Sequence, residues 1–194
     1  PHEVENIHLY PWREVIGRAG LLGVMSSYND YDGIPVQGSK YWLTERLRDD
    51  FGFKGYVVSD SDAVEYLHSK HHVSADMKES VRQSVEAGLN VRCTFRTPDS
   101  YVMPLRELVE EGKLSMSVID ERVRDILRVK FLVGIFDRPY QTDYEAADRE
   151  VNGTLNNEIA LRASRESIVL LKNEDSLLPI DKTGIRKLAV IGPN

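Results

Sequence analysis

Cysteine is nearly absent, since the 194 residues contain only Cys93. This excludes an internal disulfide framework and a cysteine-rich zinc site. Long apolar runs are also missing: the longest, residues 21–25 and 168–171, are far too short to cross a bilayer. Basic residues are not in excess, because 25 Lys and Arg stand against 31 Asp and Glu, a net charge of -6. We therefore expect neither a nucleic-acid nor a membrane partner.

The remaining composition is that of a folded globular protein, with 41% hydrophobic and 29% charged residues. The sequence opens at Pro1 without a signal segment. It stops just after an apolar run at 187–191 that is typical of a strand, and such a strand would have no hydrogen-bonding partner nearby. We therefore expect the sequence to be a piece of a longer protein.

Apolar runs alternate with amphipathic stretches over the first 135 or so residues. Continuous apolar runs predict three buried strands, at residues 21–26, 55–59 and 89–93. Helical spacing of apolar residues predicts helices over 3–18, 39–51, 76–87, 98–111 and 117–132. Strands followed by helices indicate parallel βα units, so the pattern predicts an α/β fold. Part of a barrel and a small open sheet both fit it.

The pattern changes toward the C-terminal end. Residues 139–154 hold several acids and few apolar residues, which predicts a linker. A helix is expected over 155–172, with Ile159, Ala160, Ala163, Ile168 and Leu171 facing inward.

Two acids follow the second predicted strand, Asp60 and Asp62. Ligands of parallel α/β folds bind at the carboxyl ends of the strands, where a carboxylate can serve as nucleophile, base or metal ligand. The ordinary alternative is that such an aspartate caps the next helix. We expect Asp62 to be the cap and Asp60 to be the reactive group.

Polar residues also follow the first predicted strand. Tyr28 can donate a hydrogen bond to a carboxylate or a sugar hydroxyl, and Met25 can line an apolar wall. A turn rich in Asn and Asp, with Met25 in the core, is the alternative. Arg92 lies within the third predicted strand and Arg96 just past its end. A surface ion pair is the default role of these arginines, although Arg96 is placed to face the site.

Four segments, in this order, carry a family resemblance: residues 25–29 (MSSYN), 47–60 (LRDDFGFKGYVVSD), 129–137 (VKFLVGIFD) and 167–174 (SIVLLKNE), followed by LPI at 178–180 and VIGPN at 190–194. Together they resemble glycoside hydrolase family 3. The second segment is similar to the active-site signature of that family, and the last two match the end of its first domain and the opening of its second. The resemblance spans nearly the whole sequence.

The resemblance implies a fold and a domain division. Residues 1–138 would be the C-terminal part of a (β/α)8-like barrel, 139–154 the linker, and 155–194 the beginning of an α/β sandwich domain. The implied parent is a retaining exo-acting β-glycosidase that releases terminal glucose or xylose from oligosaccharides, without cofactor or metal. A periplasmic or secreted location also follows from the family.

The resemblance also implies roles for individual residues. Asp60 would be the nucleophile that forms a covalent glycosyl-enzyme intermediate, and Met25, Tyr28 and Ser61 would line the sugar subsite. The family's general acid/base, commonly a Glu, would lie beyond Asn194. The remainder of the polypeptide, or a complementary chain, would then have to supply it, and the piece alone would be inactive.

One departure concerns Ser61, since family members often carry a tryptophan directly after the nucleophile. The aromatic surface that would stack on the sugar is missing at that position. Two other functions stay open. The first is a non-catalytic carbohydrate-binding or scaffold fragment. The second is a barrel enzyme of metal-assisted chemistry that uses Asp60 and Asp62 together.

Overall fold

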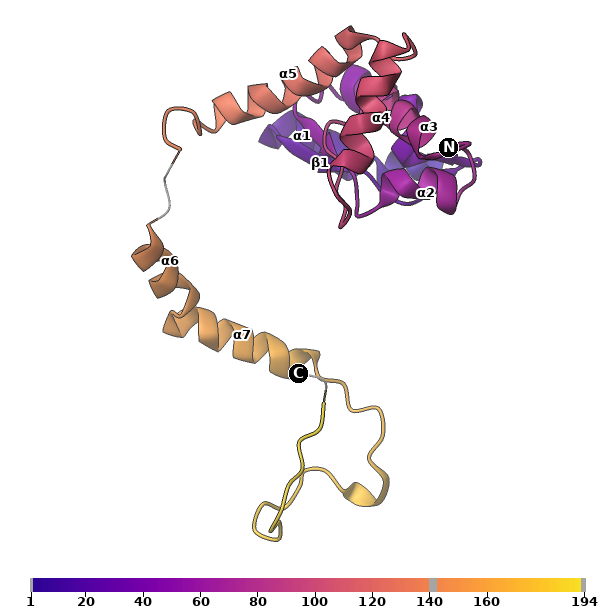
Figure 1. The fold of residues 1–194 in the computed structure, drawn as a ribbon. Helices are drawn as coiled ribbons and strands as arrows, with labels where there is room; N and C mark the ends of the chain where they lie inside the picture. Colours follow the sequence, from indigo (N-terminus) through magenta and orange to yellow (C-terminus); the bar gives the residue numbers. More distant parts are fainter. Residues whose placement is uncertain (1, 140–142, 193–194) are drawn as a thin grey trace. The chain divides into compact units, whose positions relative to one another are not determined.

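Two parallel strands, β1 (Gly23–Met25) and β4 (Tyr56–Val58), form the centre of the fold (Figure 1). The computed structural model describes residues 2–139 and 143–192, and the chain divides into two units, Pro1–Tyr140 and Gln141–Asn194. The two strands pair in register. A single parallel bridge extends this pairing by joining Val58 to Val91.

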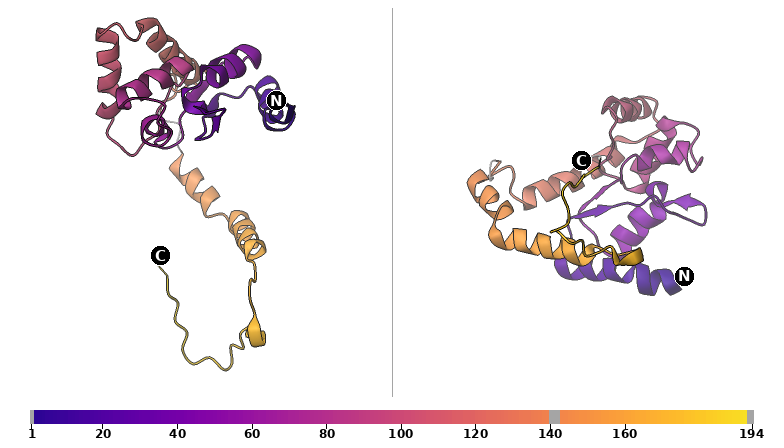
Figure 2. Two further views of the ribbon diagram at one scale, coloured as in Figure 1. Left: turned by 90° about the vertical axis from the view of Figure 1, so that its right-hand side faces the viewer. Right: turned by 90° about the horizontal axis from the view of Figure 1, so that it is seen from below.

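Helices surround these strands in the first unit, and Figure 2 shows them from two further sides. The helices are η1 (Val4–His8), α1 (Tyr10–Ala19), η2 (Val36–Gly38), η3 (Tyr41–Asp50), α2 (Ala63–Ser69), α3 (Met77–Ala87), α4 (Asp99–Glu110) and α5 (Met116–Leu132), and the short antiparallel pair is β2 (Asp30–Tyr31) with β3 (Ile34–Pro35). Helix α3 packs against both α2 and α4. Its N-cap is Asp76, whose side chain accepts a hydrogen bond from the backbone N–H of Glu79 at 2.8 Å.

The hydrophobic core lies between the strands and these helices. Its fully buried members include Val57 of β4, Leu67 of α2 and Leu89, while Phe53 is 2% exposed. Burying a side chain of this size stabilises a fold by about 1.5–3 kcal/mol. The core therefore fixes β4 and, with it, the turn that follows at its carboxyl end.

Arg48 joins several segments at the opposite, amino end of β4. Its guanidinium donates to the carbonyl of Gly55 at 3.1 Å and to Oδ1 of Asn90 at 2.8 Å, and it lies 3.0 Å from Oδ2 of Asp125 in α5. Burial lowers the pKa of Arg48, and the charge of Asp125 opposes that effect. Arg48, which belongs to the signature-like segment 47–60, therefore has a structural role at the end of β4 that is away from Asp60.

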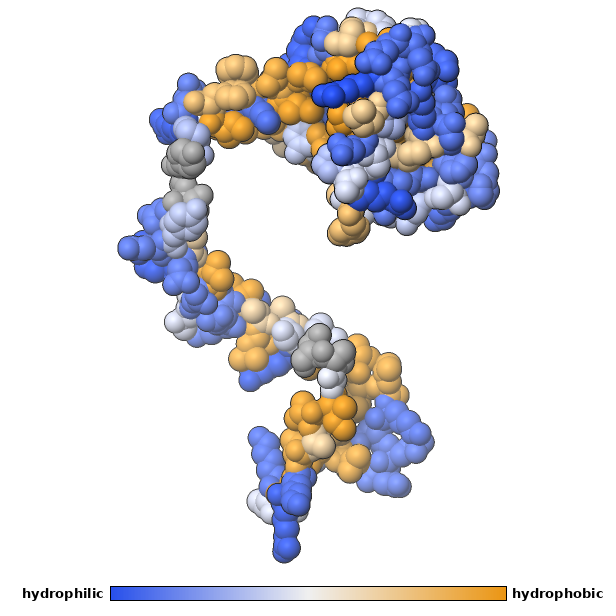
Figure 3. Space-filling model, in the orientation of Figure 1, coloured by the Kyte–Doolittle hydropathy of each residue, from blue (hydrophilic) through white to orange (hydrophobic). Residues whose placement is uncertain are grey.

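Apolar side chains are collected along α5 (Figure 3). The second half of this helix extends beyond the other helices of the first unit in Figure 1 and in the right-hand view of Figure 2. Phe131 and Leu132 near its end are each 65% exposed. Among the described residues, no helix combines the length and the apolar content that crossing a membrane requires.

The second unit contains α6 (Tyr144–Val151), α7 (Thr154–Ser167) and the short helix η4 (Glu174–Ser176). Residues 139–154 were expected to be a linker, but α6 forms there because Asp143 caps it, accepting from the backbone N–H of Ala146 at 2.9 Å. The helix expected over 155–172 ends at Ser167, and its predicted inward positions are exposed. Residues 168–192 form no strand, since an isolated strand has nothing to pair with.

The fold is thus mixed α/β and mostly helical, and the described residues do not close a barrel. Two of the three predicted strands form. The third, predicted at 89–93, is reduced to the bridge at Val91, because the side chain of Asn90 bonds to the backbone N–H of Val57 and to Arg48. The parallel arrangement expected from the sequence is confirmed for β1 and β4.

Candidate active site

Asp60 lies at the carboxyl end of β4, two residues beyond Val58. The residue is half-buried. Its Oδ1 accepts a hydrogen bond from the backbone N–H of Ser61 at 2.6 Å, and its carbonyl accepts from the backbone N–H of Ala63 at 3.1 Å. A buried strand and the first turn of α2 therefore hold the backbone of Asp60 on both sides, and the Ser61 N–H orients its carboxylate.

Tyr28 comes from the loop that follows β1. Because β1 and β4 are paired and parallel, both loops begin at the same edge. The Tyr28 hydroxyl donates to the carbonyl of Ser61 at 2.6 Å. Burial, together with the nearby Asp60 carboxylate, raises the pKa of Tyr28 to about 12. The hydroxyl therefore stays protonated at neutral pH, and its proton is donated to the carbonyl of Ser61.

Met25 and Ser61 occupy different surroundings. Met25, at the end of β1, is 57% exposed and lines a hollow of ≈ 430 Å³ together with Tyr31 and Trp42. Among the described residues that line this hollow, Met25 is present, but the other three predicted site residues, Tyr28, Asp60 and Ser61, are not. Ser61 is half-buried, and its hydroxyl lies 3.6 Å from Sγ of Cys93. The structure thus brings Tyr28, Asp60 and Ser61 together.

Asp62 stands at the start of α2, but its side chain does not cap the helix. It accepts a hydrogen bond from the hydroxyl of Thr94 at 2.6 Å instead. The φ angle of Asp62 is 58°, in the left-handed region, which costs on the order of 1 kcal/mol or more for a residue other than glycine. The expected capping role is therefore wrong, because the backbone turns at Asp62 in a way that directs its carboxylate toward Thr94.

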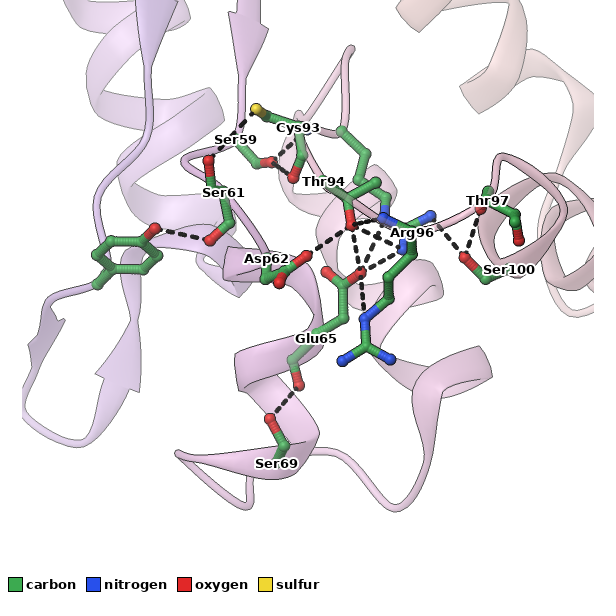
Figure 4. A network of polar contacts seen from close by, with 12 residues as sticks. Ser59, Ser61, Asp62, Glu65, Ser69, Cys93, Thr94, Arg96, Thr97 and Ser100 are labelled. Carbon is green, nitrogen blue, oxygen red and sulfur yellow. Dashed lines mark hydrogen bonds and ion pairs between the residues drawn. The ribbon is translucent and has the colours of Figure 1, made fainter. Parts of the chain in front are cut away.

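Behind this turn lies a network of polar side chains (Figure 4). Glu65 of α2 is 6% exposed and forms an ion pair with Arg92, whose side chain is 3% exposed. Arg96 approaches the same carboxylate at 3.7 Å. The expectation of a surface ion pair is wrong for Arg92, because the guanidinium is enclosed by Glu65, Ser100 and the ring of Tyr101.

Glu65 and Thr94 were not among the residues singled out in the sequence. They lie 29 residues apart, so no local pattern joins them. An indirect signal is present in the acidic Glu65 within the apolar run AVEYL, since a charge on a buried helix face requires a partner. In the described part of the chain, no three potential metal ligands come together.

The sequence and the fold were compared with known proteins. Residues 1–129 match the model of the glycosyl hydrolase family 3 N terminal domain. The chain is 37% identical to a putative beta-xylosidase of Formosa agariphila over 94% of its own length and 24% of that relative. It is 35% identical to a periplasmic beta-glucosidase of Salmonella typhimurium, over 90% of the chain and 23% of that relative. This chain therefore belongs to glycoside hydrolase family 3.

Solved structures give the same picture. A β-glucosidase from Erythrobacter marinus superposes with a TM-score of 0.73 at 37% identity, over 92% of this chain and 23% of that one. A mutant β-glucosidase from Listeria innocua, in complex with laminaribiose, superposes with a TM-score of 0.71 at 31% identity, over 91% of this chain and 25% of that one. The same Listeria enzyme has also been solved with glucose. The chain spans about a quarter of the length of the relatives it matches.

Proposed function

We propose that this chain carries the nucleophile of a retaining, exo-acting β-glycosidase and that the nucleophile is Asp60. The enzyme would release terminal β-linked glucose or xylose from oligosaccharides by double displacement. The observation that carries the proposal is the meeting of Asp60 and Tyr28 at the carboxyl edge of β4 and β1. This is the edge at which (β/α)-type folds bind their ligands.

The surroundings of Asp60 suit a nucleophile. The carboxylate must be ionised to attack the anomeric carbon, and hydrogen-bond donors favour the ionised form. The backbone N–H of Ser61 is such a donor, and the Tyr28 hydroxyl lies near the carboxylate while it donates its own proton to the carbonyl of Ser61. Attack forms a bond between an Asp60 oxygen and the anomeric carbon while the bond to the leaving oxygen breaks. A water then hydrolyses the glycosyl-enzyme ester and restores the carboxylate.

A retaining cycle needs a second carboxyl group about 5–5.5 Å from the first, which protonates the leaving oxygen and then activates the water. We propose that the remainder of the polypeptide, or a complementary chain, supplies this group. Asp62 does not suit the role, because its carboxylate is bound by the Thr94 hydroxyl.

The choice of glucose or xylose is supported by the relatives, which are named as β-xylosidases and β-glucosidases. Ser61 bears on the fit of the sugar, since it places a small hydroxyl directly after the nucleophile. An aromatic surface for the sugar would then have to come from another position. No metal or cofactor takes part in the proposed cycle.

The test is to trap the intermediate. A fluorinated glycoside that forms the glycosyl-enzyme quickly and hydrolyses slowly is added to the complete polypeptide, and the adduct is located by peptide mass mapping. The proposal expects the sugar on Asp60. A label on Asp30, Asp32 or Asp62 would overturn the assignment.

Two controls separate the alternative functions. A metal chelator should leave the hydrolysis unchanged, whereas it would abolish a metal-assisted reaction that uses Asp60 and Asp62. Binding of a glycoside without turnover or a trapped adduct would identify a non-catalytic carbohydrate-binding protein instead.

A further inference from the structure

The turn at Ser61 and Asp62 is held by side chains that take no direct part in the proposed reaction. We infer that Glu65, Arg92 and Thr94 form a positioning cluster that fixes the Asp60 carboxylate for attack by acting on this turn. The inference rests on the proposed function, because it assigns the cluster to the same site. It concerns positioning residues, since none of the three is required to touch the sugar.

The first step concerns the backbone of Asp62, the residue that follows Ser61. Asp62 lies two positions after Asp60 and has a positive φ angle. Two contacts keep it there: its backbone N–H donates to the carbonyl of Cys93 at 3.0 Å, and its Oδ1 accepts from Thr94 at 2.6 Å. If Asp62 relaxed to an ordinary φ angle, the chain direction at Ser61 and Asp60 would change with it.

The second step concerns the direction of the Thr94 hydroxyl. A hydroxyl has one proton to donate and two lone pairs that accept. The backbone N–H of Arg96 donates to Thr94 Oγ1 at 3.1 Å, and Nη2 of Arg92 lies 3.4 Å from it. These donors occupy the lone pairs, so the proton is left for a carboxylate. Asp62 at 2.6 Å is nearer than Glu65 at 3.2 Å and receives it.

The third step is the ion pair that fixes Arg92. Nε of Arg92 donates to Glu65 Oε1 at 3.1 Å, and Nη2 bonds to the same oxygen. Nη1 donates to Ser100 at 3.0 Å, and the guanidinium lies 5.5 Å from the ring centre of Tyr101. Apolar residues of equal size often stabilise a core as well as a buried ion pair does. The buried pair of Glu65 and Arg92 is therefore better explained by a role in positioning Thr94 than by a gain in stability.

Together the contacts form one chain of support. It runs from Glu65 on α2 through Arg92 and Thr94 to Asp62, and then along two residues of backbone to Asp60. Figure 4 shows Glu65, Thr94 and Asp62 of this chain. Catalytic groups have to be held within about 0.5 Å of their productive position. On the other side of the turn, the Tyr28 hydroxyl holds Ser61 through its carbonyl.

The test compares two identical substitutions in the complete polypeptide. Thr94→Val removes the hydroxyl that holds Asp62, and Thr44→Val is the matched control. The Thr44 hydroxyl also donates one hydrogen bond, at 2.7 Å to the carbonyl of Ala87, and it makes no contact with the turn at Ser61. Thr94→Val should lose more stability in urea than Thr44→Val, because the Thr94 hydroxyl also accepts from the backbone N–H of Arg96 and from Arg92. The two variants are therefore compared in kcat without urea, at a temperature where both are folded.

Only Thr94→Val should lose kcat on an aryl β-glycoside, by roughly 10- to 100-fold, with KM changing much less. Thr94→Ser should recover most of the loss, because it restores the hydroxyl. Arg92→Lys keeps the charge but loses the planar fork, and it should reduce kcat even if Thr94→Val does not fold. If both Val variants fold and have equal kcat values, the inference is overturned. If Thr94→Val does not fold, the inference is overturned when Arg92→Lys has the kcat of the wild type.

Asp60→Asn in the same assay separates this inference from the proposed function. If Asp60→Asn is inactive while Thr94→Val matches its control, only the positioning role is wrong. If Asp60→Asn keeps full turnover, the proposed nucleophile is wrong. A crystal structure of Thr94→Val, or of Arg92→Lys, gives a readout without activity: residues 60–62 should shift, and an unchanged turn would contradict the inference.

Discussion

The Tyr28 hydroxyl donates to the carbonyl of Ser61 at 2.6 Å and so joins the loop after β1 to the turn after β4. The two residues are 33 positions apart, and the parallel pairing of the strands brings them together. The negative charge of the Asp60 carboxylate also contributes to the raised pKa of Tyr28. A stabilising contact and a candidate catalytic group are therefore linked through one side chain.

Tyr28→Phe should change how stability depends on alkaline pH. Tyrosine in an unfolded chain loses its proton near pH 10, whereas the pKa of Tyr28 in the folded chain is raised to about 12. Between these values the folded state binds more protons than the unfolded state, so stability falls as pH rises. Urea unfolding from pH 9 to 12 should show a shallower fall for Tyr28→Phe. Tyr144→Phe, at a position 81% exposed, serves as the control.

Asp60→Asn should abolish hydrolysis by the complete polypeptide and leave its fold nearly intact. The amide cannot form the glycosyl ester, so turnover should fall at least about 1000-fold. Asp32→Asn is the control, because Asp32 is exposed and its φ of 54° is one that asparagine tolerates. Rates are measured with an aryl β-glycoside and stability with a thermal melt. Equal losses in the two variants would contradict the role of Asp60.

Asp125→Asn should destabilise the first unit strongly. It removes the negative charge that faces Arg48 at 3.0 Å, in a pair whose side chains are each only 12% exposed. Breaking such a buried pair costs about 3–5 kcal/mol. The comparison is Lys78→Met, which breaks the ion pairs of Lys78 with Glu107 and Glu111. These pairs are more exposed, so the free energy of unfolding should fall by less than about 1 kcal/mol. Urea titration of both variants measures the difference, and similar losses would refute the importance of the buried pair.

Gly55→Ala should disrupt the pairing of β1 with β4. A Cβ atom at this position would lie 2.1 Å from the carbonyl oxygen of Leu22, which is backbone and cannot move aside. We expect a loss of at least about 2 kcal/mol. Gly17→Ala is the matched control in α1, where nothing lies within 4 Å of the added atom, and it should gain about 0.5–1 kcal/mol. If the two variants had equal melting temperatures, the close approach of Leu22 would be of no consequence.

The 194-residue chain by itself should hydrolyse aryl β-glycosides very slowly or not at all. The retaining cycle requires a second carboxyl group, and the proposal places that group outside this chain. The assay compares equal amounts of the chain and of the complete polypeptide. Adding the missing part as a separate chain should restore turnover. Full activity of the chain alone would show that one of its own acids serves as the acid/base.

The central part of the fold could be predicted from the sequence because its signals are local. Apolar runs ending in turn formers predicted β1 and β4 and placed Tyr28 and Asp60 after their carboxyl ends. That the two strands are neighbours is a finding of the structure. The catalytic roles of these residues stay predictions. The run at 89–93 misled because Asn90 contacts Arg48 and Val57 through its side chain, contacts that no local pattern encodes.

The errors at Asp62 and Arg92 have a common cause. Propensity alone makes Asp62 a cap, but Thr94, 32 residues away, draws its carboxylate in another direction. Propensity also places arginine at the surface, but Glu65, 27 residues away, pairs with Arg92 in the interior. Helix α6 was missed for the opposite reason, since the few apolar residues of this segment predicted a linker while a local cap at Asp143 starts a helix there.

The position of Arg48 has a consequence for how members of this family are recognised. Arg48 and Gly55 lie in the same signature segment as Asp60, yet they maintain architecture at the far end of β4. A homologue that lost its aspartate but kept these two residues would still fold and would still score as a member. Under the proposed function such a homologue would fold without a nucleophile, so a match to the segment as a whole is not evidence of activity and the residue at position 60 has to be inspected by itself.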